Sequence, residues 1–391
     1  MIILSIETSC DETAISIVEA VGDFPHTKYE ILGNALYSQI EIHREFGGVF
    51  PTLAKREHIA TIVPMLELAL KEANLPKNEY TPALTPEQKA ELAQILNREP
   101  NLADQLITLH QAVGQPPIDL IAVTSGPGLE PALWVGVNFA KALSALWSVP
   151  VVPVDHMEGH ILASIFDGHH LAKLEFPAIS LLVSGGHTEL ILLSAWGKYE
   201  KIGATRDDAV GEAFDKVARL LGLPYPGGPE ISKKAEEARE RQLPAFAKLP
   251  APMLNSGDLD FSFSGLKTAV LTVVKDKNLS TDERSALARD FEDVVVKVLI
   301  EKLKQAIDKY AVKSVILGGG VAANKQLRSS LAGLKSPTLF PDLKVYLPDI
   351  ALSTDNSVMI ALAGHSHLNE TLTPAELQAL RADGNKSLVN K

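Results

Sequence analysis

Two stretches of the chain share one pattern of hydrophobic and polar positions. The first runs from Ile2 to Val18 and the second from Ala178 to Leu193. Each begins with an apolar run typical of a buried strand, passes through a short polar turn, and ends in a second β-rich run. Both turns are rich in glycine or hydroxyl residues, whose hydroxyl and backbone N–H groups can surround an anion. One such hairpin is an ordinary structure, but its recurrence at the head of each half predicts a duplicated domain with a ligand held between the halves.

After each hairpin, helical and strand patterns alternate. In the first half we expect a helix over residues 56–73, bent at Pro64, and a second helix over 134–147. In the second half a long amphipathic pattern over 284–310 precedes a strand and the Gly318–Gly320 turn. Further predicted elements are strands at 120–124, 149–154 and 313–317 and helices at 212–221 and 231–241. This alternation favours an α/β fold with mostly parallel sheets.

Two segments depart from this alternation. Residues 75–117 are rich in Pro, Ala, Gln and Glu, with a helix start at Thr85 and a candidate helix cap at Asn101. We therefore predict a helical hairpin inserted into the first domain, without a role in the chemistry. The tail should form one short helix and then a polar end that frays. The predicted domains are residues 1–155 and 156–364, followed by a tail of residues 365–391.

The composition excludes several classes of protein. Of 391 residues, 46% are hydrophobic and 22% are charged, so wholesale disorder is excluded. Cys10 is the only cysteine, which rules out an internal disulfide and favours a reducing compartment, the cytoplasm. We expect no signal peptide, because the start is not basic, and no membrane span, because polar residues interrupt every apolar run. The net charge of −11 argues against nonspecific coating of nucleic acid but permits a local basic patch.

His156 and His160 are spaced to bind one metal ion. Four residues apart on a helix, their imidazoles share one face. This is not the H-E-x-x-H protease motif, because Met157 follows the first histidine and Glu158 lies off the shared face. Asp355, at a loop-to-helix junction, is a candidate third ligand, and such a set leaves positions open for a substrate oxygen. A chance histidine pair and a helix N-cap role for Asp355 are the open alternatives.

Other motifs are ambiguous when each is taken alone. The Gly318–Asn324 segment follows a strand and precedes a helix, so it suits either a nucleotide or a simple turn. Asp215 lies in an apolar stretch, where an acid needs a partner. The glycine and proline residues of 225–229 suit a binding edge or a turn. The segment 261–267 mixes aromatics, hydroxyls and a lysine, and it fits either a nucleic-acid edge or a half-buried strand.

Eight motifs occur in one order along the chain. They are Ile6–Thr13, Ser125–Leu129, His156–His160, Leu182–Thr188, Gly211–Lys216, Tyr225–Pro229, Asp260–Lys267 and Thr354–Asn356. Together they closely resemble the bacterial tRNA N6-adenosine threonylcarbamoyltransferase family, TsaD, formerly called glycoproteases. The resemblance runs from the first strand to about Gly364. Residues 75–117 are longer than the family's usual link, and the tail after His365 does not match.

This resemblance implies two related actin-like lobes, of the ribonuclease H-like and ASKHA type, around a nucleotide cleft. It implies that His156, His160 and Asp355 bind one divalent metal ion per subunit, iron or zinc. It places substrate binding at Leu182, Val183, Ser184, Gly185, Gly186, Asp215, Gly228 and Asn324.

The resemblance also implies the reaction and the partners. The family transfers the threonylcarbamoyl group from threonylcarbamoyl-adenylate to the exocyclic amine of the adenosine 3′ of the anticodon. The tRNAs concerned read codons that begin with A, and AMP is released. Asp11 and Glu12 are our candidates for the base that takes the proton from the amine. Lys55, Arg56 and Lys267 are candidate tRNA contacts. Implied partners are TsaB-like and TsaE-like proteins, with a TsaC-like protein supplying the adenylate, and a homodimer stays open.

Three other functions remain as alternatives. A kinase-like ATPase of the same fold would share the phosphate-binding hairpins without needing the histidine pair. A metalloprotease is disfavoured by the missing glutamate after His156, and no G-x-S-x-G serine motif occurs. Cys10 is a poor nucleophile because the neighbouring Asp11 disfavours a thiolate. A non-catalytic scaffold subunit would lack the metal residues, and all three are present here.

Overall fold

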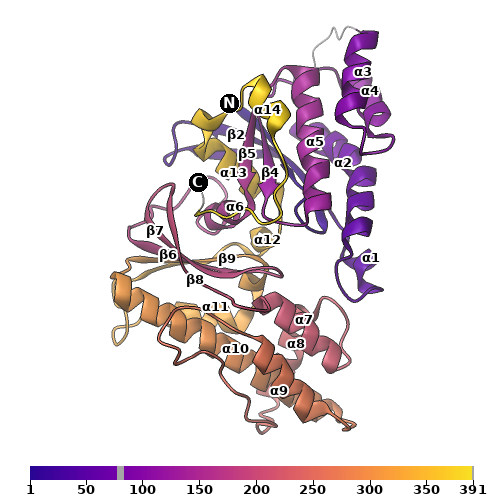
Figure 1. Ribbon diagram of the computed structural model, residues 1–391. Coiled ribbons are helices and arrows are strands. Elements are labelled where there is room, and N and C mark those ends of the chain that lie inside the picture. Colours follow the sequence, from indigo (N-terminus) through magenta and orange to yellow (C-terminus); the bar gives the residue numbers. More distant parts are fainter. Residues whose placement is uncertain (77–82, 390–391) are drawn as a thin grey trace. The chain divides into compact units, whose positions relative to one another are not determined.

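The computed structural model describes residues 1–76 and 83–389, so part of the expected insertion, residues 77–82, lies outside the described residues. Within the described residues, two five-stranded sheets occur (Figure 1). The chain divides into two compact units, each containing one sheet. The first unit consists of Met1–Glu41, Val49–Ala172 and Asp355–Lys391, and the second of Ile42–Gly48 and Lys173–Thr354.

The first sheet has the strand order β3-β2-β1-β4-β5. Strands β1, β2 and β3 form an antiparallel meander, and β4 and β5 continue the sheet parallel to β1. The first predicted hairpin is the β1–β2 pair, in which Ile6 lies opposite Ile15. The five strands are β1 (Ile2–Glu7), β2 (Glu12–Val21), β3 (Lys28–Ser38), β4 (Leu120–Gly126) and β5 (Val151–Asp155).

The second sheet repeats this topology strand for strand. Its order read from the meander edge is β8-β7-β6-β9-β10, with β6, β7 and β8 antiparallel and β9 and β10 parallel to β6. The second predicted hairpin is the β6–β7 pair. Its strands are β6 (Ala178–Val183), β7 (Thr188–Ala195), β8 (Lys198–Ala204), β9 (Ser314–Gly318) and β10 (Lys344–Tyr346). The predicted duplicated α/β fold is therefore confirmed.

Helices α2 (Pro51–Ala73) and α5 (Glu130–Trp147) cover one face of the first sheet (Figure 1). Ile6 of β1 and Val123 of β4 belong to the same buried cluster as residues of both helices. Both helices begin earlier than predicted, because a proline stands in the first turn of each, where its missing N–H costs nothing. Helix α2 continues through Pro64 as one helix.

Helix α13 (Ser357–Ser366) packs against the first sheet. The strand residues that it contacts alternate along the strands with those that face α5. A Cβ on Gly364 would lie 2.5 Å from Cβ of Ala122, so glycine permits the close approach of α13 to β4. The Ser16 and Ser357 hydroxyls are 2.5 Å apart in the same contact. Strands buried on both faces explain why the first strand reads as a continuous apolar run.

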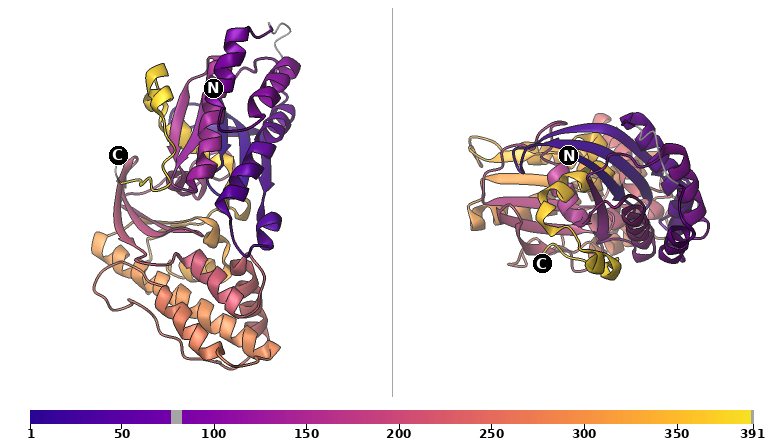
Figure 2. Two further views of the ribbon diagram at one scale, coloured as in Figure 1. Left: turned by 45° about the vertical axis from the view of Figure 1, so that its right-hand side comes forward. Right: turned by 90° about the horizontal axis from the view of Figure 1, so that it is seen from above.

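The insertion forms the predicted helical hairpin, α3 (Pro86–Ile95) and α4 (Leu102–Val113), beside α2 and α5 in Figures 1 and 2. Thr85 and Gln88 form a reciprocal capping box at the start of α3. Helix α4 begins after Asn101 as predicted, but the Asn101 side chain makes no capping hydrogen bond, so that part of the prediction is wrong. Leu106 is fully buried, which anchors the hairpin on the core of the first unit.

Helix α10 (Thr281–Tyr310) is the longest element of the second unit (Figure 2). It begins with a Ser280–Glu283 capping box and packs with α7 and α8 around the core beneath β6. Phe261 and Phe263 are fully buried in that core. The segment 261–267 is half-buried as one alternative expected, but the strand of that alternative is wrong, because Phe261 makes only an isolated bridge with Thr205 and α9 begins at Ser264. The unit's other helices are α7 (Val210–Leu220), α8 (Gly227–Glu240), α9 (Ser264–Val274), η1 (Gly320–Ala323), α11 (Lys325–Ala332) and α12 (Ile350–Ser353).

The compact units differ from the expected domain boundaries at 155/156 and 364/365. Helix α6 (His156–Ala163) and residues from Asp355 onward group with the first unit, because α13 packs on both α6 and the first sheet. The chain first passes from the first unit to the second within α1 (Ile40–Arg44), between Glu41 and Ile42.

The tail contains η2 (Leu368–Glu370) and α14 (Pro374–Ala379), and it stays packed beyond them. Ala382 and Leu388 are buried, and the Asp383 amide donates to the Ser125 carbonyl at 2.9 Å. The expectation of a frayed polar end is wrong for the described tail, because these contacts hold it against the end of β4. Among the described residues, no helix is both long enough and apolar enough to cross a membrane.

Candidate functional site

The histidine pair lies at the start of α6, directly after β5. The Asp155 carboxylate accepts the Met157 amide at 2.9 Å and the Glu158 amide at 3.4 Å, which starts the helix. His156 and His160 then lie one turn apart, with ring centroids 4.7 Å apart and ring planes at 85°. Both side chains are buried. The predicted shared face therefore exists.

Asp355 faces both histidines from the loop between α12 and α13. Its Oδ1 lies 3.3 Å from His156 Nε2 and 3.2 Å from His160 Nε2. Asn356, and not Asp355, caps α13, with its side chain accepting the Met359 amide at 3.0 Å. The N-cap alternative for Asp355 is therefore excluded. One ligand atom from each of the three residues lies within 4.8 Å of the others, which makes a candidate metal site.

Gly159 explains how α6 comes close to α13. A Cβ at this position would lie 3.0 Å from Met359 Cγ and 3.2 Å from Ile360 Cδ1. The small residue between the histidines thus brings the helix that carries them next to the segment that carries Asp355. Glu158 Oε2 lies 2.7 Å from His367 Nε2, outside the cluster, as its spacing predicted.

The cluster's polar atoms fit a metal ion. His160 Nε2 is buried and has no hydrogen-bond partner among the described residues, because its 3.2 Å approach to Asp355 lacks hydrogen-bond geometry. Burial lowers the pKa of His160 more than Asp355 raises it, which favours the neutral imidazole that a metal requires. Burial also lowers the pKa of His156, but Asp355 and Glu7 outweigh it and raise that pKa well above its usual value, so a metal ion would displace a proton there. Burial raises the pKa of Asp355, but His156 and His160 outweigh it and hold that pKa well below its usual range. Two imidazoles and an ionised carboxylate are donors that suit iron or zinc.

Glu7 supports the cluster from the end of β1, and sequence reasoning did not assign it this role. Its Oε2 lies 3.1 Å from His156 Nδ1 and accepts the Thr124 hydroxyl at 2.5 Å, while its Oε1 accepts the Ser9 amide at 2.5 Å. Burial raises the pKa of Glu7, but the charge of His156 outweighs it, so the carboxyl is more acidic than usual. A carboxylate on Nδ1 directs Nε2 of His156 toward Asp355. An acid inside an apolar strand was the available signal, because a buried carboxylate needs a partner.

We expect Glu7→Gln to weaken metal binding by about 10- to 100-fold, as outer-shell substitutions at metal sites do. The amide keeps the shape but loses the charge that orients His156. The measurement is competition for the metal with a chromogenic chelator. Glu19→Gln, in β2 and outside the cluster, is the matched control. Equal affinity of the Glu7→Gln and wild-type proteins would contradict the role assigned to Glu7.

The candidate base residues lie at the tip of the first hairpin. Helix α2 holds this tip, since His58 Nε2 lies 3.0 Å from the Cys10 carbonyl and His58 Nδ1 lies 2.7 Å from the Thr13 hydroxyl. Burial, followed by the charges of Asp11 and Asp355, raises the pKa of Glu12 well above its usual value. Burial likewise raises the pKa of Cys10, which agrees with the prediction that this thiol is not a nucleophile.

In the second unit, two glycines bracket the turn that follows β6. A Cβ on Gly211 would lie 2.6 Å from the Ser184 carbonyl oxygen, and one on Gly319 would lie 2.5 Å from the Val183 carbonyl oxygen. The Ser184 amide donates to the His187 carbonyl at 2.9 Å, and the His187 amide donates to the Ser184 hydroxyl at 3.1 Å. These contacts fix the turn while Gly185 and Gly186 stay exposed.

The predicted substrate-binding residues of this turn differ in which of their groups a ligand could reach. The Leu182 and Val183 side chains are fully buried, and β6 pairs here with β7 and β9, so neither residue presents a side chain to a ligand. Open space surrounds the Cβ positions of Gly185 and Gly186. The turn therefore offers backbone amides, as its composition predicted.

The remaining predicted substrate positions lie around α8 and α11. Asp215 Oδ1 accepts the Gly227 amide at 2.7 Å, which fixes the loop carrying Gly228, a residue with open space at its Cβ position. Asn324 caps α11 by accepting the Leu327 amide at 2.8 Å. Its Nδ2 donates to Glu292 Oε1 at 2.7 Å and to the Ser232 hydroxyl at 2.9 Å. The polar atoms of the Asn324 side chain are thus engaged within the protein.

The three candidate tRNA contacts belong to different units, Lys267 to the second and Lys55 and Arg56 to the first. Lys267, on α9, is half-buried and lies 3.9 Å from Asp208 Oδ2. Lys55 and Arg56 lie in the first turns of α2, where Arg56 is exposed and pairs with Glu57 at 3.2 Å.

The two matching sheets and the His–Asp cluster define a duplicated α/β protein with a candidate metal centre. A family model described as TsaD, tRNA N6-adenosine threonylcarbamoyltransferase, matches residues 30–81 and 101–362. The chain belongs to this family.

Curated relatives agree with the family match. The tRNA N6-adenosine threonylcarbamoyltransferase of Ralstonia pickettii (strain 12J) is 42% identical over 383 residues, covering 97% of this chain and 94% of the relative. That of Burkholderia cenocepacia (strain J2315) is 42% identical over 371 residues, covering 93% and 91%. Among solved structures, full-length HypF in its phosphate- and nucleotide-bound form matches with a TM-score of 0.47 and 14% identity, covering 69% of this chain and 41% of HypF.

Proposed function

We propose that this protein transfers the threonylcarbamoyl group from threonylcarbamoyl-adenylate to N6 of the adenosine 3′ of the anticodon, in tRNAs that read codons beginning with A. AMP is the other product. The observation that carries the proposal is the 42% identity to tRNA N6-adenosine threonylcarbamoyltransferases over almost the whole chain. The assembled His156, His160 and Asp355 cluster supports it, since a scaffold or a kinase-like ATPase has no need of one.

We further propose that His156, His160 and Asp355 hold one iron or zinc ion. The buried Nε2 of His160 and the ionised Asp355 support this assignment. When bound, such an ion polarises a substrate oxygen and stabilises the negative charge that develops during transfer. Glu7 keeps the His156 ring in the orientation that the cluster needs.

The adenylate is assigned to the turns of the second unit. The amides of the exposed Gly185 and Gly186 suit the phosphate, since successive backbone N–H groups form an anion-binding concavity. Ser184 acts by fixing the turn, because its amide donates to the His187 carbonyl. Leu182 and Val183 act by positioning the end of β6 that leads into the turn. Asp215 acts by holding the Gly228 loop, and Asn324 acts by fixing the start of α11.

The transfer step needs a proton acceptor. The exocyclic amine of adenosine attacks the carbamoyl carbon, the bond from that carbon to the phosphate oxygen breaks, and AMP leaves with the electron pair. Asp11 and Glu12 are proposed to receive the amine proton. Burial and the charges of Asp11 and Asp355 raise the pKa of Glu12, which makes its carboxylate a stronger base than that of an ordinary glutamate.

The partners and location belong to the same proposal. We place the protein in the cytoplasm, with TsaB-like and TsaE-like proteins as partners and a TsaC-like protein as the source of the adenylate. A homodimer is the second assembly to test. The single cysteine is consistent with a reducing compartment.

The test is a transfer assay. The purified protein is mixed with threonylcarbamoyl-adenylate and an unmodified tRNA that reads an A-starting codon, with and without the partner proteins. The tRNA is then digested for nucleoside mass spectrometry. We expect threonylcarbamoyladenosine. Its absence with partners and with added iron or zinc would overturn the proposal, and ATP hydrolysis would then favour the kinase-like alternative.

A further inference from the structure

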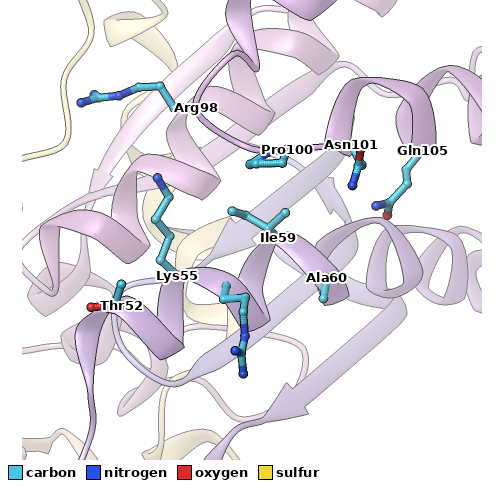
Figure 3. Close-up of a pocket in the computed structure, with 9 residues that line it drawn as sticks. Thr52, Lys55, Ile59, Ala60, Arg98, Pro100, Asn101 and Gln105 are labelled. Atoms are coloured by element: carbon cyan, nitrogen blue, oxygen red, sulfur yellow. The ribbon is translucent and has the colours of Figure 1, made fainter.

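Two adjoining pockets of the first unit form a continuous groove that the chemistry above does not use. Their volumes are about 510 and 440 Å³, and both are lined by Lys55 and Arg98. Figure 3 shows the first pocket, with Lys55 on α2 and Arg98 on the corner between α3 and α4. Arg381, from the tail after α14, and Trp134 of α5 line the second. We call this surface the basic groove, defined by Lys55, Arg56, Arg98, Trp134 and Arg381.

The basic groove carries an excess of positive charge in a chain whose net charge is −11. Among the described residues, Lys55, Arg98 and Arg381 make no ion pair within 4.0 Å. Arg56 pairs with Glu57 at 3.2 Å, so three cations remain against the two lining carboxylates, Glu99 and Glu130. Glu99 is buried and accepts Asn138 Nδ2 at 3.2 Å with each oxygen, so it faces into the protein.

Trp134 gives the basic groove a flat aromatic surface. The ring is half-buried, with the Arg98 guanidinium 5.6 Å and the Lys141 ammonium 5.8 Å from its centroid. The ring holds these cations by cation–π attraction. Cations beside an aromatic face are the combination by which proteins bind nucleic-acid backbone and stack on its bases.

Helices α2 and α5, which line the basic groove, also connect it to the metal cluster. At the start of α5, the Leu129 amide donates to the Ser9 carbonyl at 2.7 Å. The Ser9 hydroxyl in turn lies 3.2 Å from His156 Nδ1. At the start of α2, Lys55 precedes His58, which contacts the Cys10 carbonyl. The helices that line the groove therefore also hold the hairpin tip that flanks the cluster.

From these observations we propose that the basic groove binds the sugar–phosphate backbone of the substrate tRNA, away from the nucleotide that reacts. The inference rests on the proposed function. The cations come from three separate parts of the chain, namely α2, the corner between α3 and α4, and the tail. Such a spread suits an extended polyanion better than a single phosphate ion, which needs converging buried donors. Arg98 and Arg381 lie outside the two segments that the family model matches, whereas Lys55, Arg56 and Trp134 lie within them.

The test compares two triple variants of the full chain. Lys55→Ala with Arg98→Ala and Arg381→Ala removes three groove cations. Lys71→Ala with Lys248→Ala and Lys335→Ala removes three exposed lysines elsewhere and is the charge-matched control. Binding of unmodified tRNA is measured by fluorescence anisotropy from about 50 to 200 mM salt, the range over which phosphate contacts weaken markedly. Steady-state transfer kinetics and the binding of a TsaB-like partner are measured on the same proteins.

We expect the groove variant to bind tRNA at least about tenfold more weakly and to lose about 2 to 3 units from the slope of log K against log salt, near one per phosphate contact. The loss should be equal for a tRNA that is not a substrate. The KM for tRNA should rise, while kcat and the KM for the adenylate stay unchanged.

Three results would overturn the inference. One is tRNA affinity and salt slope equal to those of the control. Another is displacement of tRNA by millimolar inorganic phosphate, which would mark a small-anion site. The third is loss of the protein partner with tRNA affinity intact, which would mark a protein interface. A wild-type protein that binds tRNA through the groove but makes no product would contradict the proposed function and not this inference.

Discussion

The His160→Ala protein is expected to purify without bound metal and to lose transfer activity by more than about 100-fold. Removing a ligand has a larger effect than the 10- to 100-fold that outer-shell changes produce. His160 is fully enclosed by protein, and the described residues offer its Nε2 no hydrogen bond. Its polar neighbour is the Asp355 carboxylate at 3.2 Å, so a metal ion held by both residues would satisfy this buried nitrogen.

The measurement is metal per chain by mass spectrometry after loading with iron or zinc, together with nucleoside analysis of the product. Because alanine leaves a cavity, Asp355→Asn is the second variant, since it keeps the shape while removing the charge. His170→Ala, at an exposed histidine of the same unit, is the control. Normal product from a folded His160→Ala or Asp355→Asn protein without metal would refute the metal assignment.

The Gly319→Ala protein is expected to lose stability by about 1–3 kcal/mol and to bind the adenylate at least tenfold more weakly. Its backbone has φ +89°, a conformation that residues with a Cβ adopt with strain. The added carbon would lie 2.5 Å from the Val183 carbonyl oxygen and 2.8 Å from its carbon, both backbone atoms that cannot rotate away. Overpacking of this kind typically costs about 1–3 kcal/mol. The displaced strand end is the one that leads into Ser184–Gly186, so binding should fall with stability.

Gly320→Ala is the matched control for this substitution. It lies one residue further along, has open space at its Cβ position and does not require a positive φ. Its stability should stay within about 0.5 kcal/mol of wild type. Thermal unfolding and adenylate affinity, measured on both variants, decide the outcome. If Gly319→Ala matched Gly320→Ala in both, the turn would not depend on the contact with β9.

The sequence predicted those parts of the site that are local. The i, i+4 spacing placed His156 and His160 on one face, and the two hairpins appeared as apolar runs broken by small residues. The sequence pattern could not predict contacts between segments that lie far apart along the chain. Glu7 reaches His156 across 149 positions, and the basic groove draws Arg381 to Lys55 only because the tail returns to α5. Spacing also could not decide whether Asp355 caps a helix or faces the histidines, because the answer depends on Gly159 and on Asn356 taking the cap.

The first unit is discontinuous along the chain, and this has a consequence for its biosynthesis. Residues 173–354 form most of the second unit and separate His160 from Asp355. At about 5–20 residues per second, synthesis of that stretch takes on the order of 10–40 s. During that time the nascent protein carries a histidine pair without its carboxylate and a sheet without α13. Metal loading of the complete cluster is therefore a late event, which follows translation of the whole second unit.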